Sequence, residues 1–336
     1  MKTLMFILAG LVSWQAHALQ VTVTIPPLAA MVKPYLTPDD TLTVLLSPGA
    51  SPHGFQFRPS HLTALNEADL ILTVGSGVDR WADKAIRQMM AERAASADDK
   101  TPTPVWVVMQ KQPGLAVLPK RAATDGGDAH QHGHEAHDGH DAHDSHGHEE
   151  TETQENQIHG DAQTVAPLKM DGHTWLSVHN AGLMIEAIGE AIATLKPQEA
   201  EQIRAQQETN LVALAEADQA IQTQLASVEK VPYLVLHDAF QYFEKRYHLN
   251  NQGAIQVSAE VKPSVKRVLA LRQRIQSDGI QCVFKEPQFS DKQLRYITRG
   301  LDVKIGELDP LGRNQSHQSY PEFIQGLAMQ YRACLE

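Results

Sequence analysis

Short apolar runs alternate with longer amphipathic stretches along both halves of this sequence. The runs are rich in β-branched residues and end at Pro, Gly or polar residues, which is the pattern of buried strands. Strands are predicted at 21–25, 41–46, 69–74, 105–109, 233–236, 254–257, 281–284 and 303–308. Helices are predicted at about 60–68, 79–95, 177–195, 238–247, 264–277, 291–299 and 320–335. This alternation is typical of βαβ units, so the sequence predicts an α/β fold with a parallel sheet in each half.

A long stretch without Gly or Pro separates the two halves. It follows Pro197, and its apolar positions recur at helical spacing: Ile203, Leu211, Leu214, Ala217, Ile221 and Leu225. At about 1.5 Å per residue, one helix of this length would extend about 50 Å. That is more than one small domain requires. We interpret residues 197–229 as a rigid helix that connects two similar lobes, at 19–196 and 230–336.

One segment of the first half has a different composition from the rest. Residues 125–152 contain eight histidines and nine acidic residues, with no Lys or Arg and no aliphatic residue larger than Ala. Such a segment cannot bury enough apolar surface to offset its ordering entropy, so we predict a disordered, metal-attracting insertion at about 120–166. It carries nine of the net 11 negative charges, which leaves −2 for the rest of the chain. No basic patch suggests a nucleic-acid partner.

The first 18 residues have the pattern of a secretory signal peptide. Lys2 precedes an apolar run from Leu4 to Trp14, and Ala16-His17-Ala18 fits a cleavage site. The alternative, an N-terminal membrane anchor, is disfavoured because the run is too short to span a bilayer. No other stretch reaches that length, so we expect cleavage after Ala18, export to the periplasm and no membrane insertion.

The two cysteines, Cys282 and Cys334, lie far from the N-terminus, where a lipid tether would have to be attached. In an oxidising compartment two cysteines usually pair, and the bond would fix the C-terminal helix. The alternative is two unpaired buried thiols.

Four possible metal ligands lie where ligands of parallel sheets bind, beyond the carboxyl ends of strands or in adjoining loops. They are His53, His173, His237 and Asp309. Each histidine alone fits a surface or core position as well, but all four residues fall in predicted loops, two from each half. Three imidazoles with one carboxylate or water suit tetrahedral Zn²⁺. We therefore predict a zinc site in the cleft between the lobes.

The same loops resemble five motifs of the zinc-uptake periplasmic solute-binding proteins, the ZnuA-type receptors of ABC importers. The motifs are Pro48–Phe55 with Arg58–Ser60, Asp171–Ser177, His237–Phe243, Phe284–Phe289 and Leu308–Gly312. The resemblance implies two α/β lobes joined by a long helix, zinc bound by His53, His173, His237 and Asp309, and delivery to the membrane permease of a zinc ABC importer. It also implies a monomer, with periplasmic zinc chaperones as further partners and the His-rich loop as a low-affinity zinc collector or sensor.

Two positions refine this expectation. Manganese-binding relatives tend to carry a carboxylate where this chain has His237, so imidazole favours zinc. Some zinc-binding members have Glu immediately before the first histidine, where this chain has Pro52, which leaves Asp309 or water as the fourth ligand. Glu286 is either an orienting partner of a ligand or a surface carboxylate.

Two other functions stay open from the sequence alone. Three protein ligands plus water also describe a zinc hydrolase, with Glu286 or Asp309 as the base, although no H-E-x-x-H helix is present. A periplasmic metal buffer would depend on the His-rich segment instead.

Overall fold

The computed structural model of this chain describes residues 18–95, 102–121, 170–256, 264–313 and 319–336. The predicted signal peptide and the His-rich segment lie outside these residues.

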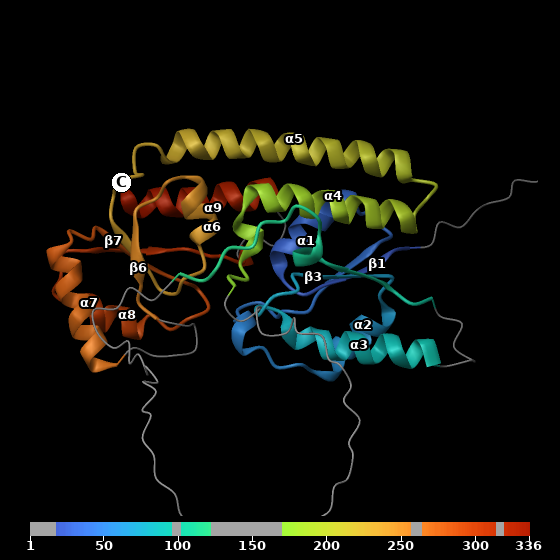
Figure 1. Cartoon of the computed structure of the whole chain (residues 1–336), viewed down its shortest axis with the longest axis horizontal. Helices are drawn as coiled ribbons and strands as arrows, with labels where there is room; N and C mark the ends of the chain where they lie inside the picture. Colours follow the sequence, from blue (N-terminus) through green and yellow to red (C-terminus); the bar gives the residue numbers. More distant parts are fainter. Residues whose placement is uncertain (1–17, 96–101, 122–169, 257–263, 314–318) are drawn as a thin grey trace, which may run out of the picture.

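Each half of the chain forms a four-stranded parallel sheet (Figure 1). The first sheet contains β1 (Gln20–Val23), β2 (Thr41–Val44), β3 (Leu70–Thr73) and β4 (Val105–Val108) in the order β2-β1-β3-β4. The second contains β5 (Tyr233–Val235), β6 (Asn251–Ala254), β7 (Cys282–Lys285) and β8 (Lys304–Glu307) in the order β6-β5-β7-β8. The second half therefore repeats the topology of the first, and the predicted α/β fold is confirmed.

Helices cover both faces of the two sheets (Figure 1). Those of the first half are α1 (Pro26–Val32), α2 (Pro59–Glu67), α3 (Arg80–Ala95) and α4 (Val178–Leu195). Those of the second half are α6 (Gln241–Arg246), α7 (Val265–Ser277), α8 (Lys292–Thr298) and α9 (Tyr320–Leu335). Short 3₁₀ turns are η1 (Lys33–Tyr35), η2 (Pro52–Gly54), η3 (Met109–Lys111) and η5 (Thr174–Leu176). Within these described ranges, no helix is both long and apolar enough to cross a membrane.

Helix α5 (Ala200–Leu225) lies along the top of both halves and packs on α4 and α9 (Figure 1). Its 26 residues extend about 39 Å, so the predicted length of about 50 Å was too great. The chain around Pro197 forms a turn, in which the Glu199 N–H donates to the Lys196 carbonyl at 2.9 Å. At the other end it turns again and buries Val228.

One continuous apolar core joins the two halves. It runs from β1 and α1 through α4 and α5 to β5 and α9. Two smaller clusters lie on the opposite faces of the sheets, one under α2 and α3 and one under α7 and α8. The two sheets are therefore connected by shared packing as well as by the chain.

A disulfide between Cys282 in β7 and Cys334 in α9 confirms the predicted pairing, with the two Cα atoms 6.0 Å apart. Gly306 of β8 lies at the same junction. A Cβ atom there would be 2.6 Å from Cε1 of Phe284 and 2.8 Å from Cβ of Cys334. Glycine at this position lets α9 approach the sheet closely.

The strand predicted at 254–257 was wrong by three residues, because β6 spans Asn251–Ala254. Its residues Asn, Gln and Gly give no apolar or β-branched run, so the hydrophobic pattern did not predict a strand there. β6 is an edge strand, and side-chain contacts around Asn251 help to hold it: its Nδ2 donates to Glu244 Oε1 at 2.7 Å and its Oδ1 accepts from the Gly253 N–H at 2.7 Å.

Candidate metal centre

Three predicted ligands come together between the halves. His53 lies in η2 after β2, His173 directly precedes η5, and His237 follows β5. Their ring centroids are 5.5, 5.5 and 5.3 Å apart, and one nitrogen from each lies within 4.8 Å of the other two. The Nε2 atoms of His173 and His237 are 3.5 Å apart. Two nitrogens bound to one tetrahedral Zn²⁺ at about 2.0–2.1 Å would be about 3.4 Å apart, so the spacing fits zinc.

His173 is held by a carboxylate two residues before it. Oδ1 of Asp171 is 2.7 Å from His173 Nδ1 and also accepts from the His173 backbone N–H at 3.0 Å. Since an ionised carboxylate can only accept, Nδ1 carries the hydrogen and Nε2 carries the lone pair. Burial alone would raise the pKa of Asp171, but His173 and the hydrogen bonds outweigh it and hold that pKa below its ordinary value.

Gly172 explains how this segment fits against the first half. A Cβ atom at this position would lie 2.5 Å from Ser76 Oγ and 3.0 Å from Val78 Cγ2. The Ser76 hydroxyl in turn donates to the Gly172 carbonyl at 3.3 Å. Only glycine allows the backbone before His173 to pack this closely on the loop after β3.

His237 is held in the same way by a carboxylate from the next strand of its sheet. Nδ1 of His237 donates to Oε1 of Glu286, which follows β7 and is only 1% exposed. Glu286 is therefore not a surface carboxylate, and its contact fixes the orientation of the His237 ring. Burial would lower the pKa of His237, but the Glu286 charge and hydrogen bond raise it above the ordinary value.

His53 has a different electrostatic environment. Its backbone N–H donates to Ser51 Oγ at 3.3 Å, which caps η2 and fixes the loop. Burial, followed by the neighbouring His173 and His237, lowers the pKa of His53 to about 2. Its imidazole is therefore neutral at physiological pH and competent to bind a metal.

Asp309, the fourth predicted ligand, is not a member of this group. It follows β8 and is 3% exposed. Its Oδ1 accepts from the Leu311 N–H at 3.0 Å and its Oδ2 from the Arg313 N–H at 2.7 Å. The next residue, Pro310, accepts a hydrogen bond from Trp175 Nε1 at 2.8 Å, which ties the Asp309 loop to the segment after His173.

The two boundaries of the segment 122–169 also meet beside the site. Pro119 and Met170 form an antiparallel bridge, and the Asp171 N–H donates to the Leu118 carbonyl at 2.8 Å. Helix α6 secures both sides, since Gln241 Nε2 donates to the Pro119 carbonyl at 3.0 Å and to Asp171 Oδ2 at 2.6 Å.

The sequence reasoning did not assign roles to Asp171 or Gln241. For Asp171 the sequence did contain a local indication. It lies two residues before the candidate ligand His173, and an Asp side chain in an Asx-type turn accepts from the backbone N–H two residues later. Gln241 lies in the motif His237–Phe243, but it comes from α6 of the other half, so no local pattern connects it with Pro119 or Asp171.

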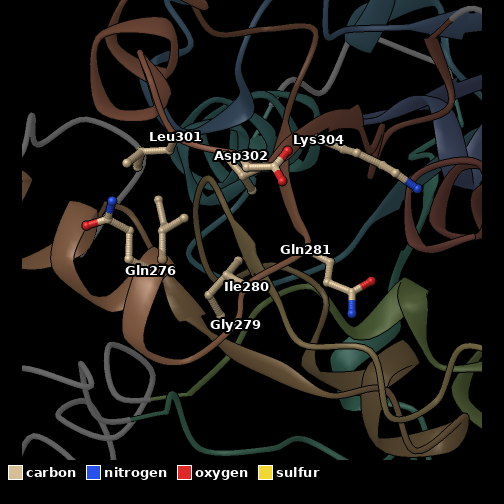
Figure 2. A pocket seen from close by; sticks show the side chains of 9 residues that line it. Gln276, Gly279, Ile280, Gln281, Leu301, Asp302 and Lys304 are labelled. Atoms are coloured by element: carbon tan, nitrogen blue, oxygen red, sulfur yellow. The ribbon is translucent and has the colours of Figure 1, made fainter.

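A hollow of about 500 Å³ lies elsewhere on the second half (Figure 2). It is lined by residues such as Ile280, Gln281, Asp302 and Lys304, at the starts of β7 and β8. Ligands of parallel sheets bind at the carboxyl ends of the strands, whereas this hollow is at the amino ends. It is therefore separate from the histidine group.

A family model described as zinc-uptake complex component A, periplasmic (ZnuA), matches residues 21–334. The high-affinity zinc uptake system protein ZnuA of Brucella abortus is 31% identical over 325 residues, which cover 94% of this chain and 91% of the relative. The protein of the same name from Haemophilus ducreyi is 30% identical over 294 residues, covering 87% and 85% of the two chains.

Solved structures share the fold at lower identity. A crystal structure of ZnuA has a TM-score of 0.71 at 19% identity and covers 95% of this chain and 100% of that one. The periplasmic zinc binding protein TroA from Treponema pallidum has a TM-score of 0.69 at 18% identity, with coverage of 95% and 99%.

Proposed function

Because the chain belongs to the ZnuA family of periplasmic zinc-uptake components, we propose that it captures Zn²⁺ between its halves and delivers it to the membrane permease of an ABC-type zinc importer. His53, His173 and His237 are the proposed zinc ligands. Zinc is the cargo, and capture and release require no catalysis.

The observation that carries this proposal is the orientation of two imidazoles. The Nδ1 atoms of His173 and His237 both face carboxylates, so both Nε2 lone pairs point at the same space, 3.5 Å apart. Two lone pairs at that distance repel each other unless a metal ion lies between them or one of the two nitrogens is protonated, as at low pH. Three imidazole nitrogens select zinc over harder cations such as Mn²⁺ or Mg²⁺, which prefer oxygen ligands.

The fourth position goes to Asp309 or to a water molecule, and Asp309→Asn decides between them. If Asp309 is a ligand, the substitution removes an anionic donor and weakens zinc binding strongly. If water is the ligand, the loss is smaller. The N–H groups of Leu311 and Arg313 donate to different oxygens of Asp309, and the single amide oxygen of Asn can still accept from one of them, so only one local contact is lost.

A zinc titration against a competing chelator tests the function. The wild-type protein should bind one tight equivalent, and His237→Ala should weaken that equivalent by more than about 100-fold, beyond the usual effect of losing an outer partner. His179→Ala is the matched control, since His179 is exposed on α4. No tight equivalent in the wild type, or an unchanged one in His237→Ala, would contradict the proposal.

Deletion of residues 125–152 separates the receptor from a metal buffer. As an accessory zinc collector, the His-rich segment should contribute only weaker sites, so the tight equivalent should survive the deletion. Loss of that equivalent would move the principal site into the deleted segment.

The proposal extends to location, partners and domains. We propose a monomer, exported to the periplasm with cleavage after Ala18, that can receive zinc from periplasmic chaperones. Its lobes are residues 19–196 and 230–336, connected by residues 197–229. Cell fractionation with N-terminal sequencing tests the export, and light scattering tests the monomer.

A further inference from the structure

A line of side chains extends from His237 away from the metal centre. Glu286 accepts from His237 through Oε1, and its second oxygen, Oε2, accepts from Gln288 Nε2 at 2.5 Å. The Gln288 carbonyl oxygen Oε1 accepts in turn from Nη2 of Arg313. Each member has one partner on each side, so His237 is connected to Arg313 through two intermediate side chains.

Arg313 is an unusual residue for this position. Its side chain is 7% exposed, and a guanidinium is buried at high cost unless its donors and charge are used. Nη2 is used by Gln288, whereas Nε has no hydrogen-bond partner among the described residues and lies 3.9 Å from Oδ1 of Asp309. The burial indicates that the guanidinium has a role at this site.

Arg313 also contacts the other ligand-bearing loops. Its backbone N–H donates to Asp309 Oδ2 at 2.7 Å. A Cβ atom on Gly49, in the loop that leads to His53, would lie 4.0 Å from Nη1 of Arg313. Gly49 has a φ of +80°, so its backbone already favours glycine, and the guanidinium lies in van der Waals range of that loop. One side chain thus lies beside segments that carry Glu286, Asp309 and His53.

We propose that Arg313 is a positioning residue for zinc binding, which acts on His237 through Gln288 and Glu286 and on Asp309 directly. The inference rests on the proposed zinc function. Arg313 fixes which way the Gln288 amide faces, so that its NH₂ group points at Glu286. The amide holds the carboxylate, and the carboxylate holds the imidazole with Nε2 toward the metal. A planar guanidinium suits this role because its donors are arranged in a fixed fork.

A purely electrostatic role and a positioning role for Arg313 predict opposite changes in zinc affinity when the residue is removed. A cation near a Zn²⁺ site repels the metal, so removing it should strengthen zinc binding if the charge were all that mattered. A positioning role predicts weaker binding when Arg313 is removed, because Gln288 can then rotate and release Glu286. The sign of the change in affinity separates the two.

The experiment compares Arg313→Met, Gln288→Leu and the double variant in full-length protein. Each single variant should weaken zinc binding about 10-fold to 100-fold, the range for outer partners of metal ligands. The double variant should bind zinc about as tightly as the single variant with the lower affinity, because both substitutions break the same line of contacts. Arg246→Met is the matched control, since Arg246 pairs with Asp218 and contacts no proposed ligand.

A second readout uses the metal-free protein. The ¹⁵N chemical shifts of the His237 ring report which nitrogen carries the hydrogen, and both variants should show loss of the fixed Nδ1–H form. If Arg313→Met does not fold, Gln288→Leu carries the test, because Gln288 is only partly buried.

Unchanged or stronger zinc binding in the variants, additive losses in the double variant, or an unchanged His237 ring spectrum would each overturn the positioning role. If the wild-type protein itself binds no zinc, the proposed function fails instead, and the ring spectrum of the metal-free variants still decides whether Arg313 orients His237.

Discussion

Two site histidines each give one ring nitrogen to a carboxylate before any metal arrives. His173 uses Asp171, and His237 uses Glu286. Such partners fix the tautomer and the ring orientation and raise the basicity of the nitrogen that binds the metal. The protein therefore orders these two proposed ligands during folding, and zinc does not have to supply that ordering energy on binding.

Asp171→Asn tests this at one carboxylate. The amide oxygen can still accept from His173 Nδ1. The NH₂ group cannot accept from Gln241 Nε2, so that hydrogen bond is lost. We expect zinc binding about 10-fold weaker, at the low end for outer partners, as measured by chelator competition. Asp278→Asn, on the surface at the end of α7, is the control. Equal affinities in the two variants would contradict a role for Asp171.

The pH dependence of zinc affinity should follow His237. A raised pKa means that His237 holds a second proton to a higher pH than an ordinary imidazole at about 6.5, and a doubly protonated ring cannot bind metal. His53, with its pKa lowered to about 2, stays neutral and does not compete. Zinc affinity should therefore begin to fall at a pH above the ordinary imidazole value of about 6.5 and fall further as the pH drops below it. The same affinity at about pH 5 and at about pH 8 would contradict a site made of histidines.

The grouping of the three histidines proposed as zinc ligands was predictable, but the residues that orient their rings were only partly so. His53 and His237 follow strands of parallel sheets, so the strand pattern places them, whereas His173 was placed by its position just before a predicted helix. Glu286 also follows a strand, and its role was one of two alternatives. Gln288 and Arg313 contact each other across 25 residues of sequence, and no local pattern reports a contact of that kind.

Among the helices and strands, too, some features were predictable from the sequence and others were not. Strand existence was predictable from apolar runs, and seven of eight strands lie where the pattern places them, with ends that differ by one or two residues. β6 was misplaced because an edge strand of Asn, Gln and Gly carries no apolar signal. The ends of α5 were overestimated because composition alone does not reveal the turns at Pro197 and before Val228.

Gly306→Ala tests the close contact between β8 and α9. The added methyl would meet the ring of Phe284 and the disulfide-bonded Cys334, neither of which can move freely. Overpacking of this kind costs about 1–3 kcal/mol in the free energy of unfolding, measured by urea denaturation. Gly77→Ala is the matched control, because nothing lies within 4 Å of the Cβ position there. Similar losses in both variants would contradict the packing argument.

The largest apolar core among the described residues passes from the first half of the molecule to the second. Helix α5 packs on α4 and α9, and α1 also contacts α9. A hinge requires a few residues that change conformation without disturbing packed side chains, and this core offers no such break. We expect small-angle scattering to give the same radius of gyration with and without zinc. A clear decrease on zinc addition would show hinge closure instead.

The disulfide between Cys282 and Cys334 contributes to the stability of the folded protein. The bond joins residues 52 apart in sequence, and the chain-entropy model gives about 4 kcal/mol for a loop of that size. The double variant Cys282→Ala, Cys334→Ala should lose about that much free energy of unfolding in urea. A reducing agent should lower the wild-type midpoint and leave the variant unchanged. A variant as stable as the oxidised wild type would contradict this contribution.

The bridge between Pro119 and Met170 has a consequence for engineering. The described residues on either side of 122–169 meet at this bridge, so a foreign domain with adjacent termini can take the place of the intervening sequence without altering either sheet. Its return end would stand only a few residues before His173. A fluorescent domain grafted there would be mechanically coupled to the zinc site, and the protein would become a genetically encoded zinc reporter.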